Sequence, residues 1–199
     1  MTQGPRRTRS SMMEETRIKL IAAGRRAFAE KGFAASSMDD LTAAADLTRG
    51  ALYHHFGDKK GLLAAVVAEI DGELAGRARR AGAAAGTGWA ALEAQGAAYI
   101  EAALDPEVQR IVLLDGPAFL GAPSQWPSQS SCLEETRAAL AALSEAGILK
   151  PVDLEAAARL LNGAALNAAL WVASSEDPAG TLPKALEAFR HLASGLLAE

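Results

Sequence analysis

The chain has 199 residues, half of them hydrophobic, and a formal net charge of −4 at pH 7. This length suits one domain or two small ones with a sizeable core. The single cysteine excludes an internal disulfide, which predicts a reducing cytoplasm, and the overall negative charge alone argues against nucleic acid as a partner.

The charges are unevenly distributed along the chain. Residues 1–60 carry eleven Lys or Arg against seven Asp or Glu, a balance of +4. Residues 61–199 carry nine against seventeen, a balance of −8. A basic end on an acidic body indicates that a polyanion meets that end only.

The composition predicts an all-α protein of about nine to ten helices. Alanine and leucine dominate, and no proline occurs between Pro5 and Pro106, so about a hundred residues can be helical without a break. The longest uncharged stretch, residues 116–133, contains three prolines and cannot serve as a membrane-spanning helix. Charged residues near the N-terminus exclude the apolar core of a secretory signal.

The N-terminal residues predict an arm followed by a helix. Residues 1–11 are polar, basic and without periodicity, so we expect a disordered arm. Arg6, Arg7 and Arg9 on it are either minor-groove contacts or charges that attract phosphates nonspecifically. Apolar residues at helical spacing predict a first helix over residues 12–31, closed by Gly32.

The next segment predicts two short helices joined by a tight turn. Ser36 or Ser37, each followed three residues later by Asp, fits the N-cap of a helix that ends near residue 45. Asp46 lies in the turn, and Thr48 caps a third short helix that reaches about His55. Such a pair is a helix-turn-helix, whose second helix enters the major groove of DNA.

The rest of the chain is also predicted to be helical. Gly57 ends the third helix, and Asp58 caps a fourth that continues through Ile70. Small residues at 81–88 predict a flexible loop, and a proline-broken stretch covers residues 116–131. Further helices are expected over about 89–104, 107–114, 133–146, 153–174 and 182–198.

A specific resemblance covers about residues 16–65. The run GRRAFAEKGFAASSMDDLTAAADLTRGALYHHFGDKKGLL is similar to the N-terminal domain of the TetR family of transcriptional regulators. Asp46 stands where that family usually has glycine in the turn, and Asp is among the residues that tolerate left-handed backbone. The resemblance implies a DNA-binding domain over residues 12–62 and a ligand-binding and dimerisation domain over residues 63–199.

The resemblance also implies which residues face DNA. The guanidinium fork of Arg49 suits guanine O6 and N7, while Tyr53 and Lys59 resemble phosphate-contacting residues of the family. His54 and His55 could instead be metal ligands, but neighbours on a helix diverge and the third histidine, His191, is far along the chain, so no metal is expected. The predicted DNA-binding residues are Ser36, Ser37, Thr48, Arg49, Gly50, Tyr53, His54 and Lys59.

The C-terminal helices predict a homodimer and a ligand pocket. The last two helices combine leucines with small residues, which suits a four-helix bundle with a second copy, although a core within one chain is the alternative. Asn162 and Asn167 either face a ligand or face solvent, and Cys132 has no basic neighbour that would favour redox chemistry. The predicted ligand-binding residues are Trp89, Tyr99, Leu113, Phe119, Trp126, Asn162, Asn167 and Trp171.

These features predict a cytoplasmic homodimeric transcriptional regulator, a repressor, that binds a pseudo-palindromic operator in double-stranded DNA. A small, mainly apolar effector would release it, and we expect no cofactor, no membrane partner and no enzymatic activity. The alternative is a helical small-molecule-binding protein or enzyme with a vestigial DNA-binding domain. The sequence contains no phosphate loop, metal cluster or nucleophile beside a base that would favour this alternative.

Overall fold

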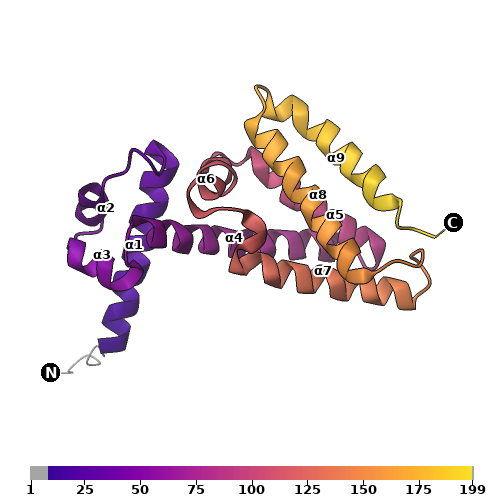
Figure 1. Ribbon diagram of the computed structural model, residues 1–199, viewed down its shortest axis with the longest axis horizontal. Helices are drawn as coiled ribbons and strands as arrows, with labels where there is room; N and C mark the ends of the chain where they lie inside the picture. Colours follow the sequence, from indigo (N-terminus) through magenta and orange to yellow (C-terminus); the bar gives the residue numbers. More distant parts are fainter. Residues whose placement is uncertain (1–8, 199) are drawn as a thin grey trace. The chain divides into compact units, whose positions relative to one another are not determined.

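The computed structural model describes residues 9–198, and almost all of this range is helical (Figure 1), which confirms the all-α prediction. Its β pairing, within that range, is one isolated antiparallel bridge between Leu149 and Leu197. The chain divides into two compact units, Met1–Val67 and Ala68–Glu199. No helix between residues 9 and 198 is both long and apolar enough to cross a bilayer.

The N-terminal unit is a small helical cluster around one apolar core. It consists of α1 (Arg9–Lys31), α2 (Met38–Ala44), α3 (Arg49–Phe56) and the beginning of α4 (Lys59–Ala85). Helix α1 begins earlier than residue 12, so residues 9–11 are helical and the predicted arm is wrong there. The rest of that arm, with Arg6 and Arg7, lies outside the described residues. The fully buried side chains of the core are Leu20, Phe28, Leu41, Leu52, Leu62, Leu63 and Val66.

Side-chain caps begin the second, third and fourth helices, as predicted. Ser37 Oγ accepts a hydrogen bond from the amide of Asp40 at 3.0 Å, and Thr48 Oγ1 accepts one from the amide of Ala51 at 3.2 Å. Asp58 Oδ1 accepts one from the amide of Gly61 at 2.7 Å. Each cap satisfies a backbone donor that the first turn of a helix leaves unpaired.

The turn between α2 and α3 depends on a left-handed residue. Asp46 has φ = 55°, and among residues 9–198 it is the one non-glycine residue with positive φ. The amide of the following residue, Leu47, donates to the carbonyl of Thr42 at 2.9 Å, which closes the turn. Asp46 therefore adopts the conformation that glycine usually supplies at this position.

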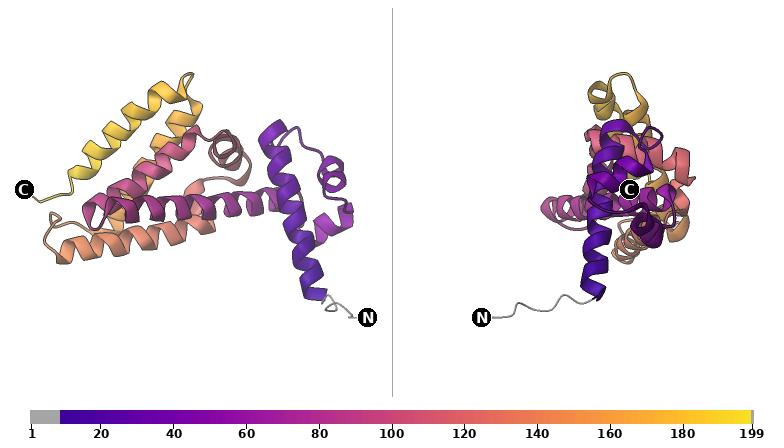
Figure 2. Two further views of the ribbon diagram at one scale, coloured as in Figure 1. Left: turned by 180° about the vertical axis from the view of Figure 1, so that it is seen from behind. Right: turned by 90° about the vertical axis from the view of Figure 1, so that its left-hand side faces the viewer.

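The C-terminal unit is built around α8 (Leu154–Ser174). This helix packs against α5 (Trp89–Glu101), α7 (Pro127–Glu145) and α9 (Pro178–Ser194), and it lies beside α9 in Figures 1 and 2. Ala158, Ala169 and Val172 of α8 are fully buried because neighbouring helices cover them. Shorter elements complete the unit: the 3₁₀ turns Ala102–Leu104 and Pro123–Gln125, the π-helix Val108–Asp115 and α6 (Gly116–Leu120).

The predicted loop over residues 81–88 is wrong for most of its length. Helix α4 continues to Ala85, because alanine is the strongest helix former and several alanines occur there. Gly82 lies against α5, where an added Cβ would come within 2.7 Å of the Gln95 amide nitrogen. This glycine permits close helix packing and does not end the helix, and the connection to α5 takes only residues 86–88.

Two other helices begin earlier than predicted, because each of them starts with a proline. Helix α7 starts at Pro127, not residue 133, and α9 starts at Pro178, not residue 182. Proline is well suited to a first helical turn, where its missing N–H would have no partner. The predicted helix over residues 107–114 is present as a π-helix.

The left-handed turn makes a prediction about Asp46. We expect Asp46→Val to lower the free energy of unfolding of the N-terminal unit by about 1–2 kcal/mol relative to Asp46→Gly, because a β-branched side chain opposes positive φ. Urea unfolding followed by circular dichroism measures this difference. Equal stability of the two variants would contradict the left-handed assignment.

Candidate nucleic-acid interface and ligand pocket

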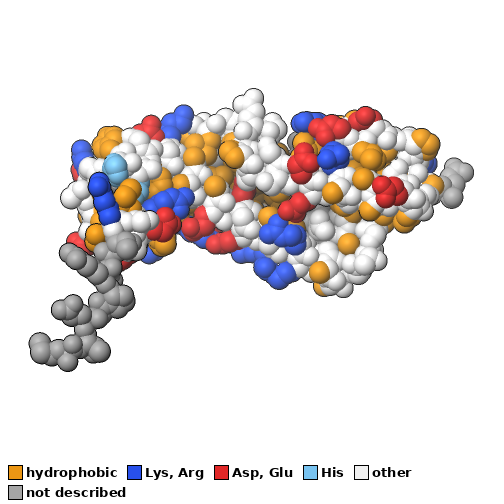
Figure 3. Space-filling view, turned by 90° about the horizontal axis from the view of Figure 1, so that it is seen from below, with side chains coloured by type: hydrophobic (Ala, Val, Ile, Leu, Met, Phe, Trp, Pro, Cys, Tyr) orange, Lys and Arg blue, Asp and Glu red, His pale blue; other side chains and the backbone are white. Residues whose placement is uncertain are grey.

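Helix α3 has one fully buried side chain and an exposed first turn. Within this eight-residue helix, Leu52 is the fully buried residue. Thr48, Arg49 and Gly50 at its start are exposed, and the side chain of Tyr53 is 54% exposed. On the face drawn in Figure 3, Lys, Arg and His side chains lie over the N-terminal unit. The start of α3 is therefore free to contact a large partner.

Arg49 forms a bidentate ion pair with Asp39 of α2. Its Nε and Nη2 donate to the two carboxylate oxygens of Asp39. The hydrogen bonds from Arg49 lower the pKa of the Asp39 carboxyl and raise the pKa of the guanidinium. Both side chains are exposed, so solvent screens the pair. A base can contact this Nε–Nη2 edge of the fork only after Arg49 leaves Asp39, whereas Nη1 takes no part in the pair.

Ser36 does not face solvent, and this burial argues against its predicted contact with a phosphate. The residue is 2% exposed, and its hydroxyl donates to the Gly32 carbonyl at 2.8 Å, which stabilises the end of α1. Ser37 is exposed, but its hydroxyl caps α2. Asp39 and Asp40 occupy the first turn of that helix, and their negative charge opposes a phosphate there.

Lys59 has a structural role that its sequence position does not indicate. Its ammonium donates to the carbonyls of Phe33 at 2.8 Å and Ser36 at 2.9 Å, and it lies 4.3 Å from the centre of the Phe33 ring. Two of its three N–H donors therefore tie the start of α4 to the segment after α1. The predicted phosphate contact can use only the remaining donor.

The histidines of α3 do not form a metal site. His54 is exposed and its ring meets that of His55 edge to face, with centroids 5.5 Å apart. Across residues 9–198, no three His, Cys, Asp or Glu side chains gather where they could hold a metal ion. His54 thus adds a polar group to the exposed face of α3.

The C-terminal unit encloses a cavity of about 100 Å³ lined by α4, α5, α7, α8 and α9. Three of the predicted ligand-binding residues, Trp89, Tyr99 and Asn162, line it. Asn162 Oδ1 accepts a hydrogen bond from the Thr136 hydroxyl at 2.9 Å, so the amide is held within the wall. Burial raises the pKa of the Tyr99 phenol well above its usual value, and the phenol stays neutral.

The other five predicted ligand-binding residues are not in this wall. Trp126 is buried against Gly116, and Leu113 is buried away from the cavity. Phe119 is half-buried outside the wall, whereas Asn167 and Trp171 are exposed on α8. An aromatic composition alone does not tell which ring faces a cavity, because that depends on helix packing.

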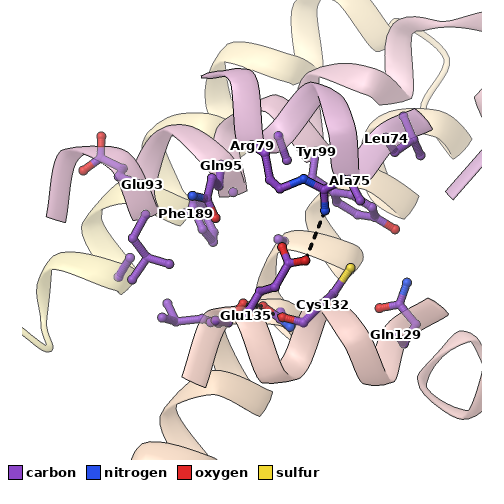
Figure 4. A pocket seen from close by; sticks show the side chains of 18 of the residues that line it. Leu74, Ala75, Arg79, Glu93, Gln95, Tyr99, Gln129, Cys132, Glu135 and Phe189 are labelled. Carbon is purple, nitrogen blue, oxygen red and sulfur yellow. Dashed lines mark hydrogen bonds and ion pairs between the residues drawn. The ribbon is translucent and has the colours of Figure 1, made fainter. Parts of the chain in front are cut away.

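The charged residues of the cavity were not predicted from the sequence. Figure 4 shows Arg79 of α4 and Glu135 of α7 joined across the pocket, an ion pair of 3.1 Å, near Cys132. Asp71 also lines the cavity although it is only 6% exposed, and the Ser128 hydroxyl donates to its Oδ2 at 2.5 Å. Burial raises the pKa of Asp71 and also that of the Cys132 thiol, which keeps this thiol protonated.

A pattern in the sequence does point to Asp71. It stands in the apolar stripe of α4, between Ile70 and Leu74, and one turn after Val67. These three neighbours are buried, so the spacing places a carboxylate on the buried face of an amphipathic helix. An acidic residue in such a stripe marks a polar site inside a core.

Helix α3 is short, exposed and preceded by a tight turn within a small helical unit. This arrangement is that of a helix-turn-helix DNA-binding protein. The family model for bacterial regulatory proteins of the tetR family matches residues 20–66, and the model for a tetracyclin repressor-like C-terminal domain matches residues 89–196. The chain belongs to the TetR family of transcriptional regulators, whose members are regulators and not enzymes.

Individual proteins resemble the chain over different lengths. A TetR-family transcriptional regulator of Pectobacterium atrosepticum is 47% identical, with a TM-score of 0.87 and coverage of 97% of this chain and 99% of that one. The TetC protein of transposon Tn10 from Escherichia coli is 29% identical over 75% of this chain and 76% of that protein. The repressor AcnR of Corynebacterium glutamicum is 37% identical over 30% of this chain and 32% of its own length.

The Lys59 contacts make a prediction about stability. We expect Lys59→Met to lower the free energy of unfolding of the N-terminal unit by about 1–3 kcal/mol, because two carbonyls lose a charged donor. The matched control Lys60→Met, at an exposed neighbour, leaves stability unchanged. Urea unfolding measures both. Undiminished stability of Lys59→Met, together with weaker DNA binding, would restore Lys59 as primarily a phosphate ligand.

Proposed function

We propose that this TetR-family regulator is a homodimeric repressor that binds a pseudo-palindromic operator through α3 and is released by a small effector in the pocket of the C-terminal unit. The observation that carries the DNA-binding part is the exposure of the first turn of α3, with Leu52 as its buried anchor. The similarity to the repressor AcnR supports the sign of regulation.

The chemistry of α3 suits the major groove. Gly50 has no side chain, and an added Cβ would meet the Thr48 hydroxyl oxygen at 3.7 Å, so glycine lets the backbone approach DNA closely. The exposed Tyr53 hydroxyl can donate to a phosphate. Arg49 reads a guanine edge after it exchanges Asp39 for the base. This exchange replaces one planar bidentate contact with another, which favours guanine over a diffuse phosphate contact.

The outer face of α8 and α9 supports the dimer. Leu160 is 71% exposed and Leu192 is 67% exposed, although both are large apolar residues near buried helices. Gly163 has no neighbour within 4 Å of an added Cβ, and Trp171 continues the same face two turns further along α8. Leucines beside an open glycine suit close packing against a second copy of these helices.

Release by an effector requires a difference in affinity between two states. An effector in the pocket contacts α4, α5, α7, α8 and α9 at once. The effector can bind more tightly to an arrangement in which the separation of the two recognition helices does not fit DNA. In that case it shifts the population of protein molecules to that arrangement. The same helix α4 that begins at Lys59 supplies Asp71 and Arg79 to the pocket.

The first test concerns Arg49 and its partner. Against a duplex selected from a random pool by the wild-type protein, we expect Arg49→Ala to weaken binding about 5- to 150-fold and to relax the preference at one base pair of each half-site. Asp39→Asn should strengthen binding about two- to fivefold, because it releases the guanidinium and removes a negative charge beside the DNA. Fluorescence anisotropy of a labelled duplex measures both.

The matched control is Arg77→Ala, which removes a comparable exposed ion pair, to Asp105, from the C-terminal unit. It should leave the affinity unchanged. Weaker binding by Asp39→Asn would show that Asp39 orients Arg49 toward DNA and does not restrain it. Unchanged binding by Arg49→Ala would remove α3 from the DNA interface.

The dimer has a separate test. Charged substitutions on the exposed stripe, Leu160→Glu and Leu192→Glu, should convert dimers to monomers in sedimentation velocity at micromolar concentration, because each buries a carboxylate between the copies. Ile18→Glu, at a comparably exposed apolar residue of α1, is the control and should remain dimeric. A wild-type protein that sediments as a monomer would contradict the proposal.

A further inference from the structure

We propose that the effector is an amphipathic amine, whose protonated nitrogen donates to Asp71 Oδ1 and whose apolar body fills the cavity between α4, α5 and α8. This inference rests on the proposed role of that cavity as the effector site, and it adds the chemical class of the effector. It specifies further the small, mainly apolar effector that the sequence predicts.

The unpaired oxygen of Asp71 carries the inference. The side chain is 94% buried, and its Oδ1 has no hydrogen-bond partner, whereas Oδ2 accepts from the Ser128 hydroxyl. A buried carboxylate with an unused acceptor is costly, because a single hydroxyl donor compensates its charge only in part. Since the same residue lines the cavity, a ligand there can supply the missing donor.

The other charged groups of the wall favour a cation over an anion. The wall contains three carboxylates, from Asp71, Glu93 and Glu135, and one cationic side chain, Arg79. Arg79 is paired with Glu135 at 3.1 Å, and Glu93 receives Arg190 at 3.3 Å. Among the carboxylates of the wall, Asp71 is left without a cation. An amine bound beside Asp71 supplies the positive charge that no side chain of the wall supplies there.

The rest of the cavity suits a small apolar body. Leu74, Leu92, Leu161 and Phe189 line it beside Trp89. Its volume of about 100 Å³ is somewhat below the about 150 Å³ of an engineered cavity that takes up benzene, so it limits the body to about one ring or a short chain. A single ring joined by a short linker to an ammonium group satisfies both the apolar wall and Asp71.

The burial of Asp71 also affects its ionisation. Burial raises the pKa of the carboxyl, which disfavours the anion. A bound ammonium group acts in the opposite direction, because an adjacent positive charge favours the ionised carboxylate. The hydrogen bond between them is charge-assisted, which makes it stronger than one from a neutral hydroxyl.

The test uses three probes of one shape and different charge on the full-length protein. These are 2-phenylethylamine, the neutral 2-phenylethanol and the anionic 3-phenylpropionate, titrated by calorimetry. We expect the amine to bind about 10- to 100-fold more tightly than the alcohol, and the carboxylate to bind most weakly. Asp71→Asn, which keeps the shape of the side chain, should abolish the preference for the amine.

A matched control separates the charge of Asp71 from the overall charge of the unit. Glu134→Gln removes an exposed carboxylate of α7 that lies outside the wall, and this variant should keep the preference for the amine. Melting temperatures check that all variants fold. The inference is overturned if the amine does not bind at millimolar concentration, if the carboxylate binds more tightly, or if Asp71→Asn keeps the wild-type preference.

DNA binding is measured separately, so that the two proposals can fail separately. If binding of the amine depends on Asp71 but leaves the affinity of the protein for the selected duplex unchanged, the result supports the amine site. It contradicts the role of this site in release from DNA. Release of the duplex by the alcohol or the carboxylate, without Asp71-dependent binding of the amine, supports an effector-responsive repressor and contradicts the amine.

Discussion

The burial of Leu52 is the constraint on which the DNA-binding surface depends. An eight-residue helix is not stable by itself, because nucleation is costly and few hydrogen bonds follow. Helix α3 is stable here because Thr48 caps its start, Gly57 ends it and Leu52 joins the core with Leu41. Leu52 is fully buried and Ala51, His55 and Phe56 are half-buried. The exposed face of α3 can therefore carry residues chosen for a partner, and Arg49 and Tyr53 occupy that face.

Several charged side chains among residues 9–198 are engaged within the protein, and this bears on the proposed function. Lys59 joins α4 to the end of α1, Arg49 holds Asp39, and Arg79 holds Glu135 in the wall of the pocket. Each partnership leaves fewer free charges than the composition suggests. On this account, DNA affinity depends on exchanging an internal ion pair for a base contact, and effector selectivity depends on Asp71, which has no ion partner.

The sequence predicted the N-terminal unit well because local chemistry determines it. The caps at Ser37, Thr48 and Asp58 and the left-handed residue Asp46 are properties of a few adjacent residues. The pocket was predicted poorly, since three of eight proposed residues line it. Whether Trp126, Trp171 or Asp71 faces a cavity depends on how distant helices pack. Residues 81–88 have the composition of a loop, and only the packing of α5 against Gly82 explains why the helix continues there.

The central claim is that α3 of two paired subunits reads duplex DNA. Selection of genomic fragments by the purified protein, followed by sequencing and footprinting, tests it most directly. The account predicts enrichment of inverted half-sites whose centres lie one helical turn, about 10 base pairs, or a multiple apart on one face of the duplex. Recovery of no common sequence, or of single half-sites without a symmetric mate, would contradict it.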